Sequence, residues 1–326
     1  GKERLGAVNL QRALTVSSDT YYYRIGDLLW RGRANFGDAA IQDSAKLFGF
    51  GQQTGIDIPS ESAGLIGTPS WLAGVYAKNP KLWDHGEWKV GDSLNVAIGQ
   101  GLVAVTPLQL ANAYATFANG GTRYQPQIAL RVTRPKSLSE ATVDISNVKL
   151  VKTFDPVVQA RAEFTDLNQY ATVYRGLQGV TSAGSGTASD AFRESPTAWP
   201  MAGKTGTAQV SRRADTSVFV GFGPATGLEP PRYAMASMIP EGGFGADASA
   251  PLVFRVLKQV SENAVEPVTP AAPQQAEAGP TVEVAPPPPP PTSLPLAPET
   301  TTTAPPGGAA SGASGGGAQN TRKRNR

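Results

Sequence analysis

Three short stretches of the sequence combine the hydroxyl, amine and carboxylate groups that nucleophilic catalysis uses. Lys204, Thr205, Gly206 and Thr207 are consecutive and follow a loop rich in Gly and Ser. Ser17 and Asp19 are separated by one residue, and Ser146 and Lys149 are three residues apart. A serine hydroxyl becomes a nucleophile when a neighbouring amine takes its proton, so a Ser/Lys pair can support covalent catalysis.

Each stretch taken alone also has a structural interpretation. Residues 143–153 have the pattern of a strand or loop, in which positions i and i+3 point to opposite faces, so the amine of Lys149 would not reach Ser146. Ser17 and Asp19 precede a predicted helix and are most simply its N-cap. A single Lys-Thr-Gly at Lys204 could form an ordinary turn.

Residues 198–205 are one residue short of a phosphate-binding loop, because Ala198 stands where the first glycine is required. Such a loop must open a helix so that backbone N–H groups face the phosphates. Residues 207–210 instead continue as a predicted strand, and Pro200 lacks an N–H. The sequence therefore argues against a nucleotide site.

The elements that must position these residues follow an order typical of an α+β fold. Residues 51–106 are rich in Gly, Pro and Trp and are predicted to be ordered loops. Three consecutive strands near the end, followed by a helix, predict an antiparallel sheet flanked by helices. The remaining predictions are helices over 5–14, 20–32, 39–48, 107–119, 155–178 and 251–263, strands over 127–133, 147–153, 201–211, 216–223 and 232–239, and a loop over 179–190.

Composition separates a tail from the folded part and excludes several kinds of site. The 326 residues include no Cys and one His, which excludes disulfides, a thiolate nucleophile and a multi-His metal site. Residues 265–326 hold 14 of the 28 Pro and no aromatic residue, so they are predicted to be disordered. Residues 1–264 are the predicted folded domain. Without the four basic residues that end the tail, the chain has 25 basic and 26 acidic residues. This balance leaves no excess of positive charge for binding nucleic acid.

Four pieces of sequence, in the family's order, resemble the penicillin-binding proteins, the D,D-transpeptidases that cross-link bacterial peptidoglycan. They are residues 13–23, which contain Ser17 and Asp19, and residues 91–101, 106–121 and 202–209. The greatest likeness is to the class B, elongation-type penicillin-binding protein 2, and the Pro-rich tail looks actinobacterial. The resemblance covers about residues 1–263 and implies the β-lactamase/transpeptidase-like fold.

The resemblance implies a catalytic role for three side chains. Ser17 relays a proton to the leaving amine. Asp19 holds the substrate backbone and the lysine of the nucleophile motif. Lys204 supplies positive charge to Ser17 and to the substrate carboxylate.

The resemblance also implies a binding role for the strand after Lys204. The hydroxyls of Thr205 and Thr207 hydrogen-bond the substrate carboxylate, and the N–H of Thr207 forms half of the oxyanion hole. Gly206 leaves room for the substrate beside the strand. No metal or cofactor is implied. The implied partners are peptidoglycan stem peptides, β-lactams, a glycan polymerase and membrane proteins of the elongation machinery.

The family's first motif, Ser-x-x-Lys, carries the nucleophile and should lie upstream of Ser17, where the chain has sixteen residues and no such motif. We therefore expect the C-terminal part of a longer enzyme. Its missing part would hold the nucleophile, a pedestal and a helix that anchors it at the extracytoplasmic face of the bacterial membrane. Two alternatives remain: a non-catalytic module that senses β-lactams or muropeptides, and a serine β-lactamase of the same fold.

Other conspicuous residues receive structural interpretations. Trp71, Trp83 and Trp88 are expected to pack within the long loop region rather than to contact substrate. Gln100, in the Gly-Gln-Gly stretch, is expected to be a polar turn residue.

Overall fold

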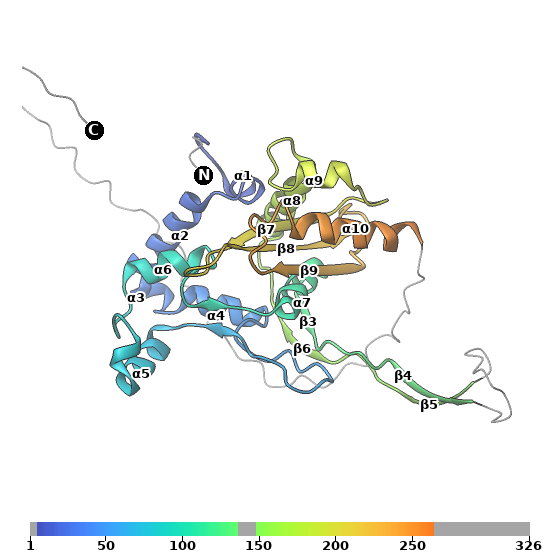
Figure 1. Ribbon diagram of the computed structural model, residues 1–326, viewed down its shortest axis with the longest axis horizontal. Coiled ribbons are helices and arrows are strands. Elements are labelled where there is room, and N and C mark those ends of the chain that lie inside the picture. Colours follow the sequence, from blue (N-terminus) through green and yellow to red (C-terminus); the bar gives the residue numbers. More distant parts are fainter. Residues whose placement is uncertain (1–4, 136–147, 264–326) are drawn as a thin grey trace, which may run out of the picture. The chain divides into compact units, whose positions relative to one another are not determined.

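The computed structural model describes residues 5–135 and 148–263 (Figure 1), and their first half is largely helical. Helix α7 begins at a capping box: the N–H of Gln109 donates to Oγ1 of Thr106, and the N–H of Thr106 donates to Oε1 of Gln109. This half contains α1 Leu10–Thr15, α2 Asp19–Arg31, α3 Arg33–Phe36, α4 Ala40–Leu47, α5 Pro69–Lys78, η1 Pro80–Leu82, α6 Val90–Ala97 and α7 Pro107–Ala118, with the short strands β1 Leu65–Ile66 and β2 Val103–Ala104 paired to each other.

The second half contains a three-stranded antiparallel sheet in the order β7-β8-β9. The strands are β7 Ala202–Ala208, β8 Thr216–Gly223 and β9 Tyr233–Ile239. The central strand carries the fully buried Phe219 and Phe222, which lie on opposite faces because side chains alternate along a strand. Both faces of the sheet therefore have to be covered, while β7 stays at an edge.

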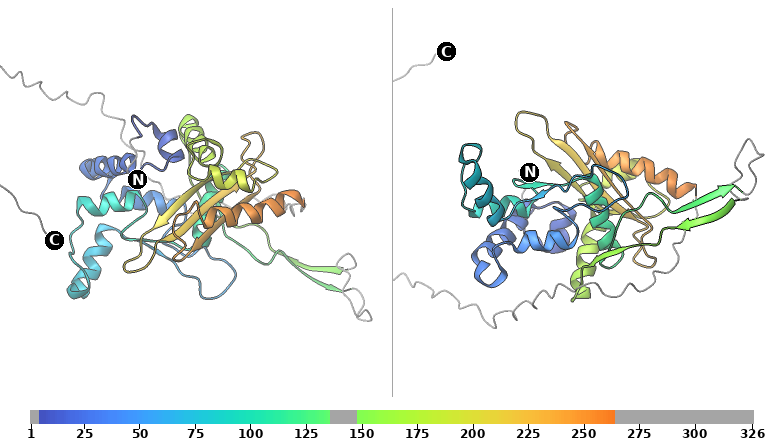
Figure 2. Two further views of the ribbon diagram at one scale, coloured as in Figure 1. Left: turned by 45° about the horizontal axis from the view of Figure 1, so that its top comes forward. Right: turned by 90° about the horizontal axis from the view of Figure 1, so that it is seen from below.

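Helices cover the two faces of this sheet (Figure 2). On one face Phe219 packs against Phe254 of α10, Ser249–Glu262, with ring centroids 5.0 Å apart. On the other face Phe222 packs with Leu177 of α8, Leu167–Ser182, and with Phe117 of α7. The predicted α+β class, with an antiparallel sheet flanked by helices, is confirmed.

A two-stranded ribbon projects away from this sheet (Figures 1 and 2). Its base pairs β3, Thr122–Tyr124, with β6, Val158–Arg161, and its outer part pairs β4, Arg131–Pro135, with β5, Val148–Thr153. The predicted strands over 127–133 and 147–153 are thus confirmed, although the first begins at Arg131.

Two predictions about longer segments are wrong in part. Residues 51–106 contain α5 and α6 as well as loops, because Oγ1 of Thr68 accepts from the N–H of Trp71 and the carboxylate of Asp92 accepts from the N–H of Lys89. The predicted helix over 155–178 begins late, since residues 158–161 form β6 and Asp166 caps α8 through the N–H of Asn168.

Other boundaries shift by a few residues. The helix predicted over 5–14 is α1, which starts after the N-cap Asn9. The loop predicted over 179–190 loses residues to α8 and to α9, Ser189–Glu194. The predicted helices 20–32, 39–48, 107–119 and 251–263 and the strands 201–211, 216–223 and 232–239 are confirmed.

Some predictions fall on residues that the structure does not describe. Ser146 and the tail 265–326 lie outside the described residues, so the predicted boundary between a 1–264 domain and a tail stays a prediction. Residues 202–208 form a strand, which agrees with the rejection of a phosphate-binding loop. Within residues 5–135 and 148–263, no helix has the length and apolar character needed to cross a membrane.

Candidate active site

Lys204 lies on the edge strand β7 and points at the turn between α1 and α2. Its Nζ donates to Oγ of Ser17 over 2.6 Å and to the carbonyl O of Thr205 over 2.9 Å. Ser17 and Lys204 are 187 residues apart in sequence. The fold therefore brings together the first and last of the four stretches that carried the family resemblance.

Ser17 occupies an unusual backbone conformation. Its φ is +54°, in the left-handed region that non-glycine residues rarely adopt. The residue belongs to the turn that ends α1, where the N–H of Ser18 donates to the carbonyl O of Ala13. Ser18, not Ser17, holds the N-cap position of α2, and no side-chain bond caps that helix. The N-cap interpretation of Ser17 is therefore wrong, and backbone strain of this kind is typical of functional sites.

The electrostatics of Lys204 come from two opposing causes. Burial disfavours the ammonium form and lowers the pKa of Lys204 to about 8, while the negative charge of Asp19 acts in the opposite direction. Asp19 is the first residue of α2 and is exposed. The site thus combines a hydroxyl, a carboxylate and an amine that exchanges its proton near neutral pH.

Thr205 is held by a residue that the sequence did not single out. The hydroxyls of Thr205 and Thr187 lie 2.6 Å apart, and the N–H of Thr187 donates to the carbonyl O of Thr15. Thr187 lies between α8 and α9, in the stretch predicted as a Gly/Ser-rich loop. A hydroxyl group in that loop could have indicated a partner for Thr205. The loop contains several Ser and Thr residues, however, and nothing in the sequence distinguishes Thr187 from the others.

Thr207 is fixed by Gln100, which sequence reasoning treated as a turn residue. The Nε2 of Gln100 donates to the carbonyl O of Thr207 over 3.1 Å. N–H and C=O groups of one strand residue point to the same side, and this side alternates along the strand. Because the carbonyls of Thr205 and Thr207 meet groups outside the sheet, the N–H groups of both residues face away from β8. The edge of β7 thus presents two backbone donors beside Lys204.

Gly206 sits between these donors and is tightly packed. A Cβ atom built there would lie 3.3 Å from Cβ of Val218, its partner across the strand pair. This contact is closer than ordinary van der Waals distance, so packing within the sheet already favours glycine.

The position of Ser17 depends on close packing between α1 and α8. The hydroxyl of Thr15 donates to the carbonyl O of Gly176 over 3.1 Å. A Cβ at Gly176 would lie 2.8 Å from Cβ of Leu14, and one at Gly179 would lie 2.3 Å from Oγ1 of Thr15. Glycine at both positions lets the two helices approach, and this approach places the turn that carries Ser17.

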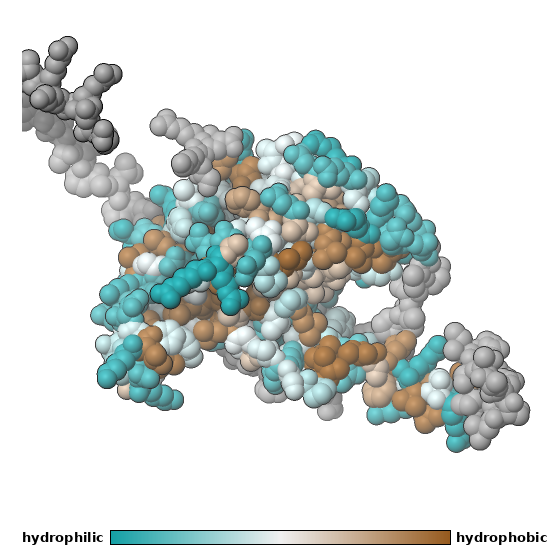
Figure 3. All heavy atoms as spheres, viewed as in Figure 1, coloured by the Kyte–Doolittle hydropathy of each residue, from teal (hydrophilic) through white to brown (hydrophobic). Residues whose placement is uncertain are grey.

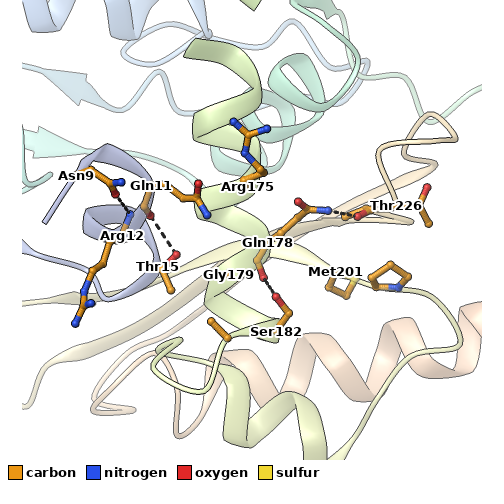
Figure 4. A pocket seen from close by; sticks show the side chains of 13 residues that line it. Asn9, Gln11, Arg12, Thr15, Arg175, Gln178, Gly179, Ser182, Met201 and Thr226 are labelled. Atoms are coloured by element: carbon orange, nitrogen blue, oxygen red, sulfur yellow. Dashed lines mark hydrogen bonds between the residues drawn. The ribbon is translucent and has the colours of Figure 1, made fainter. Parts of the chain in front are cut away.

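A cavity of about 790 Å³ lies beside α1 and α8, away from the predicted site residues (Figure 4). Residues of α1 and α8 line it together with the turns around Met201 and Thr226. None of the six predicted site residues is among its lining residues. Within the described part of the chain, no group of three or more His, Asp or Glu residues is arranged to hold a metal ion.

The tryptophans pack as expected. Trp88 is buried in a cluster with Leu72 and Val96. The rings of Trp71 and Trp83 meet edge to face with centroids 5.3 Å apart. These side chains stabilise the helical half rather than the edge of β7.

Comparison with known proteins decides the family. Residues 2–259 match the family described as penicillin binding protein transpeptidase domain. The chain belongs to this family. It is 30% identical over 259 residues to the peptidoglycan D,D-transpeptidase MrdA of Acinetobacter baumannii, covering 75% of this chain and 33% of that protein. The resemblance to the class B, elongation-type penicillin-binding protein 2 is confirmed, and the actinobacterial origin stays a prediction.

Solved structures agree with this family. The fold is similar to that of PBP2 from Pseudomonas aeruginosa in complex with WCK 5153, with a TM-score of 0.60 and 28% identity over 81% of this chain and 51% of that one. It is also similar to a chain of a peptidoglycan synthase complex that coordinates polymerization and crosslinking, with a TM-score of 0.60 and 26% identity over 80% and 39% of the two chains. The chain spans about a third of the length of the curated relatives it matches.

Proposed function

We propose that the chain is part of a D,D-transpeptidase that cross-links peptidoglycan stem peptides through a serine acyl-enzyme. The observation that carries the proposal is the 2.6 Å hydrogen bond from Lys204 to Ser17, beside the two outward N–H groups of β7. A buried amine next to a hydroxyl can pass a proton, and an outward N–H at a strand edge can bind a developing oxyanion together with a second donor from the nucleophile segment.

The nucleophile itself is proposed to come from a Ser-x-x-Lys segment of a longer protein. Its serine Oγ forms a bond to the carbonyl carbon between the two terminal D-Ala residues, the C–N bond breaks, and D-Ala leaves with a proton on its amine. An amine of a neighbouring stem then attacks the ester, releasing the serine and forming the cross-link. Two such steps need neither a histidine nor a metal.

The side chains of this chain take the following proposed roles. Ser17 delivers the proton to the leaving amine, and Lys204 supplies that proton and attracts the substrate carboxylate. Asp19 accepts hydrogen bonds from the substrate backbone, because an ionised carboxylate accepts hydrogen bonds and cannot donate them. Its negative charge also favours the charged form of Lys204. Thr205 and Thr207 hydrogen-bond the substrate carboxylate, and the N–H of Thr207 supplies one half of the oxyanion hole.

The same proposal extends to partners and location. Stem peptides ending in D-Ala-D-Ala are the substrates, and β-lactams acylate the nucleophile because they resemble that terminus. A glycan polymerase and membrane proteins of the elongation machinery are the proposed partners, which the fold shared with a peptidoglycan synthase complex supports. A helix elsewhere in the longer protein would anchor the domain at the extracytoplasmic face of the membrane.

Covalent labelling tests the proposal. A fluorescent penicillin should label the full-length protein and survive denaturation, whereas residues 1–326 alone should stay unlabelled because they lack the nucleophile. Labelling of residues 1–326 that Ser146→Ala abolishes would contradict the proposed source of the nucleophile. A full-length protein that labels but releases no D-Ala from a pentapeptide substrate would be a sensor. Rapid release of the opened penicillin would make it a β-lactamase.

A further inference from the structure

The outer part of the projecting ribbon, β4 with β5, is here named the basic ribbon. Its base is tied firmly to the loop that follows α4: the carboxylate of Asp57 accepts from the N–H groups of Ile128 and Ala129, over 2.8 and 3.1 Å. Farther in, Nε2 of Gln159 donates to the carbonyl O of Thr54. The basic ribbon is therefore presented in a defined direction, away from the β7-β8-β9 sheet (Figure 1).

Both edges of the basic ribbon are open. Among the described strands, β4 pairs with β5 and with no other, and the same holds for β5. Each strand therefore has a row of outward N–H and C=O groups without a strand partner. Such an edge is a template for the addition of another strand.

One face of the basic ribbon concentrates positive charge. Arg134 lies directly opposite Lys149, and Val132 lies opposite Lys152. An irregularity beside Val132 leaves Val151 without a partner, so Lys149 and Lys152 share a face although they are three residues apart. Like charges directly opposite each other destabilise an isolated ribbon.

These charges have no acidic partner within the described part of the chain. None of Arg131, Arg134, Lys149 and Lys152 takes part in an ion pair there. All four are exposed, and Nζ of Lys152 lies 4.4 Å from the centre of the ring of Phe154.

Aliphatic side chains lie exposed among these charges. Leu150 is 55% exposed and Val151 is 58% exposed. Figure 3 shows brown apolar and teal polar surface side by side along this projection. A partner that binds the basic ribbon has to cover aliphatic side chains, form hydrogen bonds with the backbone groups of an open strand edge and carry negative charge.

We propose that the basic ribbon is a docking site for an extended acidic segment of a partner protein, which adds as a strand to the edge of β5. Alternating Asp or Glu residues of such a strand would face Lys149 and Lys152, and its intervening apolar residues would cover Leu150. A membrane surface fits less well, because hydrocarbon leaves open backbone groups unsatisfied. Self-pairing fits less well because two copies would bring like charges together. This inference does not depend on the proposed catalytic function.

Peptide binding to residues 1–326 tests the inference. The probe is a fluorescein-labelled ten-residue peptide of alternating Glu and Val, compared with a Lys/Val peptide of equal length. We expect anisotropy to show binding of the Glu/Val peptide alone. Lys149→Glu/Lys152→Glu should weaken it by about tenfold or more, and Lys81→Glu/Arg255→Glu, an equal charge change at exposed sites elsewhere, should leave it within about twofold.

Hydrogen exchange separates strand addition from general charge attraction. Backbone amides of β5 should exchange more slowly when the Glu/Val peptide is bound. Binding without this protection, or equal weakening by both double variants, would overturn the inference. Binding to vesicles of anionic lipid with no binding of the peptide would assign the ribbon to a membrane instead, and concentration-dependent dimerisation without peptide binding would assign it to self-association.

Discussion

Two strand edges of this molecule carry lysines, and their surroundings differ. At the edge of β7, Lys204 is half-buried and its ammonium is bonded to Ser17. At the edge of β5, Lys149 and Lys152 are exposed and have no ion-pair partner among the described residues. Desolvation lowers the pKa of Lys204 into the range where it can exchange a proton, whereas exposed cations act through charge attraction over longer distances. Under the two proposals, the same residue type serves chemistry at one edge and recognition at the other.

The largest expected effect separates the two edges directly. In the full-length protein, Lys204→Ala should slow acylation by a fluorescent penicillin by at least about a hundredfold, because the proton source of Ser17 is lost. Lys149→Ala should leave that rate unchanged. Stopped-flow acylation measures both rates, and equal losses in the two variants would contradict the division of roles between the edges.

A smaller effect is expected when the edge of β7 is loosened without loss of a reacting group. Gln100→Ala removes the bond to the carbonyl O of Thr207, so the adjoining N–H groups lose their fixed direction. We expect the acylation rate constant to fall about tenfold with little change in the dissociation constant of the non-covalent complex. Gln125→Ala is the matched control, since it removes a bond from Nε2 to the carbonyl O of Gly55 at the ribbon base. A loss confined to the dissociation constant would exclude a positioning role for Gln100.

The pH dependence of acylation sharpens the electrostatic part of the comparison. If the reaction uses protonated Lys204, whose pKa is lowered to about 8, the rate should be nearly constant below pH 7 and fall about fivefold between pH 8 and pH 9. Stability has the opposite sign: between pH 8 and the ordinary lysine pKa the unfolded chain binds more protons, so stability rises with pH. Asp19→Asn should move the rate profile to lower pH, and an unmoved profile would remove Asp19 from the electrostatics of Lys204.

The smallest expected effect concerns the support of the basic ribbon. Hydrogen bonds from the N–H groups of Ile128 and Ala129 hold the pKa of Asp57 below its usual value. This stabilisation is present above the ordinary aspartate pKa and is lost as pH falls through the lowered one. Asp57→Asn should speed amide exchange at Ile128 and Ala129 by at most about tenfold. The acylation rate of the full-length protein should not change, and a changed rate would indicate coupling between the ribbon and the edge of β7.

The sequence was most informative where a local pattern alone determines the element. Pro107 at the first helical position, the apolar residues after it and a Gly-Gly stop predicted α7, and runs dominated by apolar residues predicted β8 and β9. It failed over residues 51–106, because the caps at Thr68 and Asp92 are single residues within a stretch rich in Gly and Pro. Long-range contacts were least predictable. The bonds from Thr187 to Thr205 and from Gln100 to Thr207 join side chains to a strand that local patterns do not connect to them.

The two glycines of α8 that face α1 set the distance between these helices, and that distance positions the turn that carries Ser17. Gly176 and Gly179 are not among the predicted site residues, yet each occupies a place where one methyl group would push against α1. The turn carrying Ser17 follows α1 directly, and a shift of about 1 Å would lengthen the 2.6 Å hydrogen bond between Lys204 and Ser17 beyond hydrogen-bonding range. A substitution at either glycine would therefore displace Ser17 without changing any residue of the site. A search for variants with altered penicillin response that covers only the three family motifs would overlook such a substitution.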